Sequence, residues 1–180
     1  KTIAIDATTL EANAAMRSIV RRDTGETYQE FLQRLAKASG IRTPSRQALA
    51  RLDRLRKKKG SNEEWKSPAD PDARITKMKD GRTHLAHKTE QAVDMTTGAI
   101  VAVTIEGADQ GDTTTLRKTL AQAKTQITRV QKKTGACHPG GLQEVVADKG
   151  YHSTRVLQEL EAAALRGYIS EPDRGRRKWR

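Results

Sequence analysis

Residues 144–148 read EVVAD, a short apolar run that ends on an aspartate. A turn rich in Gly and Pro over 135–141 comes before it, and this combination predicts a buried strand. Open α/β sheets place their functional sites at the carboxyl ends of strands, so Asp148 is a candidate site residue.

The chain opens with a second stretch of this kind. Residues 2–8 read TIAIDAT and predict a buried strand that ends in polar residues, with Ile3 and Ile5 on one face and Asp6 on the other. Asp6 is therefore a second candidate at a strand end. The alternative for either aspartate is a turn-forming or capping role.

The segment from residue 83 to the C-terminal region alternates between strand and helix patterns. Strands are predicted over 83–93 and 100–105, separated by a hairpin-length connection, and Asp112 or Thr113 caps the helix that follows. Ser153 caps another helix, which Gly167 ends before a last short strand. The first of these helices carries a core-facing stripe: Leu116, Leu120, Ala123, Ile127 and Val130.

Residues 15–75 have a different character, and we interpret them as a basic helical insertion that divides a core of residues 1–14 and 76–180. Residues 15–74 hold 15 Lys and Arg against 8 Asp and Glu. One helix is predicted from the spacing of Tyr28, Phe31, Leu32 and Leu35. A second is expected to start at Thr43-Pro44, to end at Gly60, and to bury a stripe of Ala48, Leu52 and Leu55.

Without the insertion, the order is three strands, helix, strand, helix, strand, which is the ribonuclease H-like order: an α/β fold with a mixed sheet and flanking helices. The first and fourth strands of such a sheet are neighbours, so Asp6 and Asp148 are expected to converge. Phosphodiester transfer uses two cations about 3.5–4 Å apart, and carboxylate oxygens suit Mg²⁺ or Mn²⁺.

The composition narrows the classes of partner. With a net charge of +12 over 180 residues, the chain favours a polyanion, either nucleic acid or an acidic membrane face. No run approaches 18 apolar residues and no secretory leader is visible, so we expect no membrane span. The single cysteine, Cys137, fits a reducing cytoplasm.

Four segments, residues 3–8, 70–74, 80–88 and 146–153, resemble those of bacterial insertion-sequence transposases of the DDE class. The last of these, with Asp148-Lys149-Gly150-Tyr151-His152-Ser153, is the most specific. The resemblance spans essentially the whole chain and implies metal-dependent cleavage and transfer of DNA strands at transposon ends. It also implies Mg²⁺ or Mn²⁺ as cofactor, double-stranded transposon-end and target DNA as partners, a homo-oligomer, and a bacterial, nucleoid-associated protein.

By this resemblance Asp6 is the first catalytic carboxylate and Asp148 the second. The family also has a third acid, a Glu on a helix after the last strand. Glu171 follows that strand but stands beside Pro172 without the expected neighbours, so we expect the third acid beyond Arg180.

Several basic residues are candidates for DNA contact, because neutralising phosphates releases counterions. Lys149 and His152 follow the second aspartate. The alternatives are that the lysine is simply solvated and that the histidine belongs to the turn entering the next helix. His84 and His87 fall on opposite faces of a predicted strand and make a poor metal pair, and Cys137-His138 lacks a second pair for zinc. The C-terminal run supplies the remaining candidates: Arg174, Arg176, Arg177 and Lys178.

Two other functions fit the same sequence. A DNA-binding remnant of a transposase without catalysis is compatible with the missing third acid. A ribonuclease or resolvase can use the same fold, since a fold alone does not fix a function.

Overall fold

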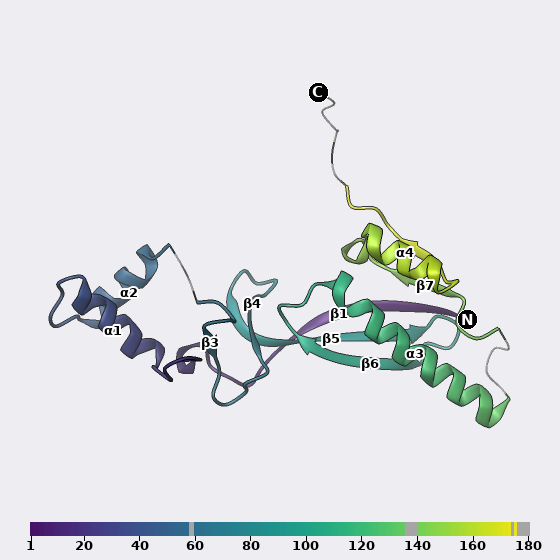
Figure 1. Ribbon diagram of the computed structural model, residues 1–180, viewed down its shortest axis with the longest axis horizontal. Coiled ribbons are helices and arrows are strands. Elements are labelled where there is room, and N and C mark those ends of the chain that lie inside the picture. The colour runs from purple at the N-terminus through teal and green to yellow at the C-terminus, as the bar shows by residue number, and fades with distance from the viewer. Residues whose placement is uncertain (58–59, 136–139, 174, 176–180) are drawn as a thin grey trace. The chain divides into compact units, whose positions relative to one another are not determined.

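The computed structural model describes residues 1–57, 60–135, 140–173 and 175. Over these residues the chain is an α/β protein with a six-strand, partly parallel sheet and four α-helices (Figure 1). The strand order is β4-β5-β1-β7-β8, and β6 pairs with β5. The strands are β1 (Thr2–Glu11), β2 (Val20–Arg21), β3 (Trp65–Lys66), β4 (Arg74–Lys77), β5 (Thr83–Asp94), β6 (Ile100–Gly107), β7 (Glu144–Ala147) and β8 (Arg166–Ile169).

The helices are α1 (Tyr28–Ala38), α2 (Arg46–Leu55), α3 (Asp112–Thr134) and α4 (Thr154–Ala162), with short 3₁₀ turns η1 (Met16–Ser18) and η2 (Lys149–Tyr151). The chain divides into two compact units, which are described separately. The first comprises Lys1–Thr8, Lys88–Glu106 and Gln110–Arg180, and the second comprises Thr9–His87 and Gly107–Asp109. The insertion predicted over 15–75 falls inside the second unit.

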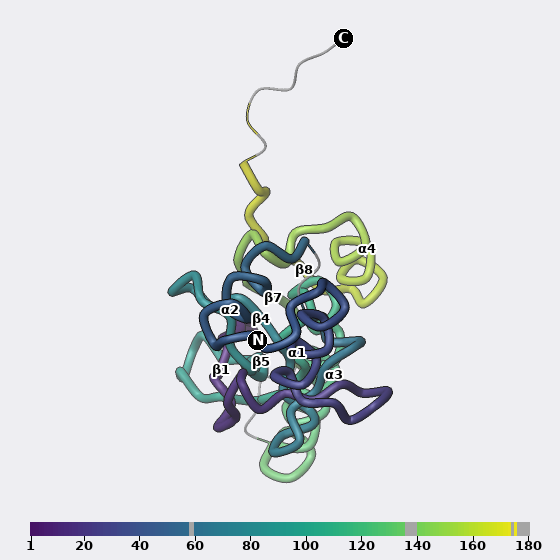
Figure 2. The backbone as a smooth tube through the Cα atoms, turned by 90° about the vertical axis from the view of Figure 1, so that its left-hand side faces the viewer, coloured from purple at the N-terminus to yellow at the C-terminus, as the bar shows by residue number. Residues whose placement is uncertain are grey.

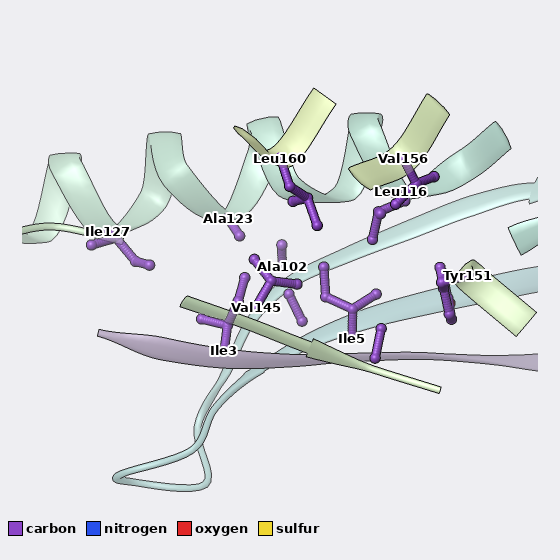
Figure 3. Packing of buried hydrophobic residues seen from close by; sticks show 12 residues of the cluster. Ile3, Ile5, Ala102, Leu116, Ala123, Ile127, Val145, Tyr151, Val156 and Leu160 are labelled. Atoms are coloured by element: carbon purple, nitrogen blue, oxygen red, sulfur yellow. The ribbon is translucent and has the colours of Figure 1, made fainter. Parts of the chain in front are cut away.

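The core of the first unit lies between the sheet and its two helices. Figure 3 shows side chains of α3 and α4 pointing toward the strands, whose own apolar side chains point back at them. Burial of this layer is what holds α3 and α4 on the sheet. Its buried members include Ile3, Ile5, Ala92, Ala102, Leu116, Ala123, Ile127, Val145, Val156 and Leu160.

The sequence patterns predicted the first residues of the helices of this unit to within one or two positions. Ser153 is the N-cap of α4, as predicted, and its side chain accepts a hydrogen bond from the Val156 amide. Gly111 is the N-cap of α3, so Asp112 is the first helical residue rather than the cap. Leu116, Ala123 and Ile127 are buried, whereas Val130 is 48% exposed, so the predicted stripe leaves the core before α3 ends.

In the second unit α1 and α2 pack side by side (Figure 2). Thr27 and Glu30 form a capping box at the start of α1, and Leu32 is buried on the predicted face. Trp65 is buried against Tyr28 and Phe31, with ring centroids 5.1 Å and 5.3 Å away. The insertion therefore has an aromatic core that includes a strand as well as helices.

The predicted limits of the second helix were wrong at both ends. The N-cap of α2 is Ser45, which accepts a hydrogen bond from the Ala48 amide, so the helix begins after Pro44 instead of at it. It ends at Leu55, because the extended backbone of Arg56 stops it before Gly60. In the observed helix Leu49 is buried in the core, whereas Leu55 is 73% exposed.

Two strands also differ from expectation. β1 continues past Asp6 to Glu11, so Asp6 lies within the strand and not at its end. The β-branched Thr8 and Thr9 favour the extended backbone, and the Ala12 amide donates to the Leu85 carbonyl just beyond. β8 begins at Arg166, so Gly167 lies inside the strand instead of ending the helix.

None of the helices in the described ranges is long and apolar enough to cross a membrane.

The turn after β5 generates a prediction about pH. The Asp94 side chain is 4% exposed, pairs with the Lys1 ammonium, and accepts hydrogen bonds from Thr97 Oγ1 at 2.8 Å and the Thr96 amide at 3.1 Å. The Lys1 hydrogen bond first, then those of Thr97 and Thr96, hold the pKa of Asp94 at about 2.

Because the folded pKa lies below the unfolded value, this carboxylate stabilises the fold above the unfolded pKa and loses that effect as pH falls toward 2. We expect Asp94→Asn to lower the free energy of unfolding at pH 7, and its difference from the wild type to shrink between about pH 4 and pH 2. Urea unfolding across this range measures it; a difference that stays constant would contradict the assignment.

Candidate metal centre

Asp6 lies within β1, and Asp148 directly follows the end of the neighbouring strand β7. β1 and β7 are parallel neighbours, and the register pairs Ile3 with Val145 and Ile5 with Ala147. The next residue on each strand is therefore one of the two aspartates. Adjacent strands lie about 4.8 Å apart, so the two carboxylates can reach a common ion. The predicted pairing of the first and fourth strands of the core is confirmed, and a metal site shared by the two aspartates stays a prediction.

Both carboxylates are exposed, and each is oriented by a local backbone amide. Asp148 caps η2, with its Oδ1 accepting from the Gly150 amide at 2.7 Å. Oδ1 of Asp6 accepts from the Ala7 amide at 2.8 Å. These bonds use one oxygen of each side chain, and none of the residues that the structure describes donates a hydrogen bond to the second oxygen.

A third carboxylate, that of Asp112, lies close to Asp148. The sequence patterns did not single it out for this role. A Cβ added to Gly150 would lie 2.6 Å from Asp112 Oδ2 and 2.9 Å from Asp148 Oδ1. These two oxygens are therefore no farther apart than the sum of those distances. A side chain at position 150 would force one of these carboxylates to move, and the close approach brings the start of α3 against the turn that follows β7.

Beneath this surface lies a buried polar group centred on Glu90, which is fully buried. Glu90 Oε1 accepts hydrogen bonds from Thr115 Oγ1 at 2.6 Å and from Tyr151 Oη at 3.0 Å. Burial first, then the negative charges of Glu90, Asp112 and Asp6, raises the pKa of Tyr151 far above its usual value. Tyr151 therefore stays neutral and keeps donating to Glu90 over the range in which the protein is folded.

The donor set fits a hard divalent cation. Carboxylate oxygens suit Mg²⁺ and Mn²⁺, and Mg²⁺ is commonly held by one or two carboxylates while water and substrate phosphate complete its shell. Within the described part of the chain, no three Asp, Glu, His or Cys side chains form a ready-made metal cage. Asp6 and Asp148 offer carboxylate oxygens for two positions in such a shell, and a cation bound there would need further oxygens to complete it.

The other residues predicted at this site are only partly placed. Lys149 is exposed in η2, beside Asp148. His152 is half-buried, and its Nδ1 is buried with no hydrogen-bond partner among the described residues. Their contact with DNA stays a prediction. Four predicted DNA contacts lie outside the described residues: Arg174, Arg176, Arg177 and Lys178.

The two histidines of β5 form hydrogen bonds with carboxylates of the second unit. His84 contacts Glu11 at 2.6 Å and His87 contacts Asp70 at 2.8 Å. A hydrogen bond to Glu11 raises the pKa of His84. Both side chains therefore link β5 to carboxylates of other segments. Cys137 and His138 lie outside the described residues.

A signal for the buried group was present in β5. Lys88, Glu90, Ala92 and Asp94 alternate along the strand and share the face that packs on α3. Charged residues at core positions of a strand are rare unless they are paired. That pattern, taken with the acidic start of the helix at Asp112, pointed to a polar cluster inside the sheet.

No protein-family model matches the chain, and no curated protein matches it either.

The role of the buried group can be tested through Tyr151. Tyr151→Phe removes one of the two donors to Glu90 Oε1, and Glu90 Oε2 already has no hydrogen-bond partner among the described residues. We expect the free energy of unfolding to fall by about 1–3 kcal/mol, because a buried carboxylate loses a hydrogen bond. Chemical denaturation measures this.

Tyr168→Phe is the matched control. Tyr168 is 48% exposed and its hydroxyl donates to Glu144 at 3.2 Å, so its loss should change stability by roughly 0.5 kcal/mol or less. If the two substitutions lower the free energy of unfolding equally, the buried Tyr151–Glu90 hydrogen bond stabilises the fold no more than the exposed one of Tyr168.

Proposed function

We propose that this chain is the catalytic-domain portion of a DDE-class insertion-sequence transposase, with Asp6 and Asp148 as two ligands of a Mg²⁺ or Mn²⁺ site that cuts and joins DNA strands. The observation that supports the proposal is the parallel register of β1 and β7, whose last pair, Ile5 with Ala147, comes one residue before each of these aspartates. When bound there, the metal would activate the attacking hydroxyl and stabilise the leaving oxygen.

The strand order supports a ribonuclease H-like assignment of the fold. β5 pairs with both β1 and β6, and β1 pairs with β7. β7 and β8 are parallel to each other and follow α3 and α4 in the chain. In open sheets of this kind, ligands bind where parallel strands end, and Asp148 stands there. The resemblance of residues 3–8 and 146–153 to the transposase motifs points to the same two strands.

DNA is the substrate class that the charge distribution favours. The chain carries +12, and the second half of α3 exposes a shallow hollow lined by basic and neutral side chains and no carboxylate. Each neutralised phosphate releases counterions and strengthens binding. Lys124 lies twelve positions along α3 from Asp112, a rise of about 18 Å, and one bound duplex can span this distance. The basic and hydroxyl residues of the hollow are Lys124, Thr125, Thr128, Arg129, Lys132 and Lys133.

In this proposal the protein acts as a homo-oligomer on transposon-end and target DNA, and a third acid from outside the described residues completes the metal shell. A second candidate is a transposase remnant that binds DNA without cutting it, which is favoured by the lack of a three-ligand cage among the described residues. A ribonuclease on the same fold differs in its substrate, and comparing RNA–DNA hybrid with transposon-end duplex separates it.

The proposal predicts a separation between activity and stability. In the full-length polypeptide, Asp6→Asn and Asp148→Asn should each lower Mg²⁺-dependent cleavage of the element's end DNA by about 100-fold or more, because each removes a metal ligand. Both side chains are exposed, so thermal unfolding should change little.

Asp72→Asn, an exposed aspartate of the second unit, is the control and should cut like the wild type. Wild-type cleavage by either site variant would refute the assignment, and a wild type that binds the DNA without cutting it would favour the remnant.

A further inference from the structure

Lys88 is a buried cation directly behind the acidic surface. Only 5% of the residue is exposed, so its ammonium cannot serve as a surface contact for DNA. Nζ lies 2.6 Å from Asp112 Oδ1, 2.9 Å from Thr115 Oγ1 and 3.4 Å from the Gln110 carbonyl. These three acceptors match the three donors of a charged ammonium group.

Asp112 connects this cation to the candidate metal centre. Its Oδ1 binds Lys88, while its Oδ2 faces Gly150 on the side where Asp148 Oδ1 lies. One carboxylate group therefore separates the ammonium from the Asp148 turn. Glu90 Oε1, 3.9 Å from Lys88 Nζ, is the other acid near this cation.

We infer that Lys88 is a positioning residue that acts as an internal counter-ion: by binding Asp112, it keeps this third carboxylate out of the metal shell formed by Asp6 and Asp148. The inference rests on the proposed metal site and concerns how many carboxylates that site offers. The Lys88–Asp112 pair is neutral as a whole, so it adds no net charge beside the two exposed aspartates.

The two members of the pair should consequently affect a bound cation in opposite directions. Removing the lysine charge frees Asp112 beside Asp148 and adds negative charge, which favours a divalent cation. Removing the Asp112 charge leaves Glu90, 3.9 Å away, as the acid nearest the ammonium, so the positive charge close to the site is less well compensated and disfavours the cation. A purely structural ion pair predicts something else, since loss of either partner would disturb the site and weaken binding.

Mn²⁺ binding to the 180-residue chain, measured by isothermal titration calorimetry without DNA, separates these cases. We expect Lys88→Met to lower the Kd by about tenfold and Asp112→Asn to raise it by about tenfold. The double variant should return to within about threefold of the wild type, because the two partners are coupled. Lys118→Met, which removes an exposed lysine of α3 paired with Glu106, should leave the Kd unchanged.

Two variants that both weaken binding, or a double variant that shows no cancellation, would overturn the inference. Breaking one side of a buried ion pair destabilises proteins, so circular dichroism reports whether Lys88→Met is folded. If it is not, Asp112→Asn against the double variant gives the same test, and the double variant must bind more tightly. The metal site itself is refuted if the wild type binds no Mn²⁺, or if Asp6→Asn leaves the Kd unchanged. If only the Lys88 and Asp112 variants depart from expectation, the inference fails and the metal site stands.

Discussion

The register between β1 and β7 is the constraint on which the rest of the site depends. Ile3 and Ile5 on one strand and Val145 and Ala147 on the other are buried in the same apolar layer. A slip of one residue would turn every side chain of a strand to its other face, so burial fixes the register. The exposed aspartates that follow have no packing role of their own. Their meeting is a consequence of the core.

The same apolar layer contains charges that hydrophobic burial alone would exclude. Lys88 and Glu90 stand on the core face of β5, where a lone charge would cost several kcal/mol. They are tolerated because Thr115, Tyr151 and Asp112 supply donors and acceptors around them. A polar cluster is thus built into the sheet behind the two aspartates, and it ties β5, α3 and the η2 turn together.

The sequence predicted those features that follow from local pattern. Apolar runs and strand order predicted the strands β5, β6 and β7, the Ser153 cap and the pairing of β1 with β7. The limits of α2 and the length of β1 were wrong, because competing caps and cross-strand pairing decide them. The contacts of Asp112 with Lys88 and with the Gly150 turn were not predicted, because these partners are distant in sequence.

Paramagnetic broadening by Mn²⁺ in the amide NMR spectrum tests the convergence of the two strands most directly. The Ala7 and Lys149 amides follow the two aspartates and lie in segments far apart in the sequence. One ion held by both carboxylates should broaden both signals together at the lowest Mn²⁺ concentrations, and Asp6→Asn should relieve both. Broadening of only one of them, or first at carboxylates elsewhere in the chain, would contradict a shared metal centre.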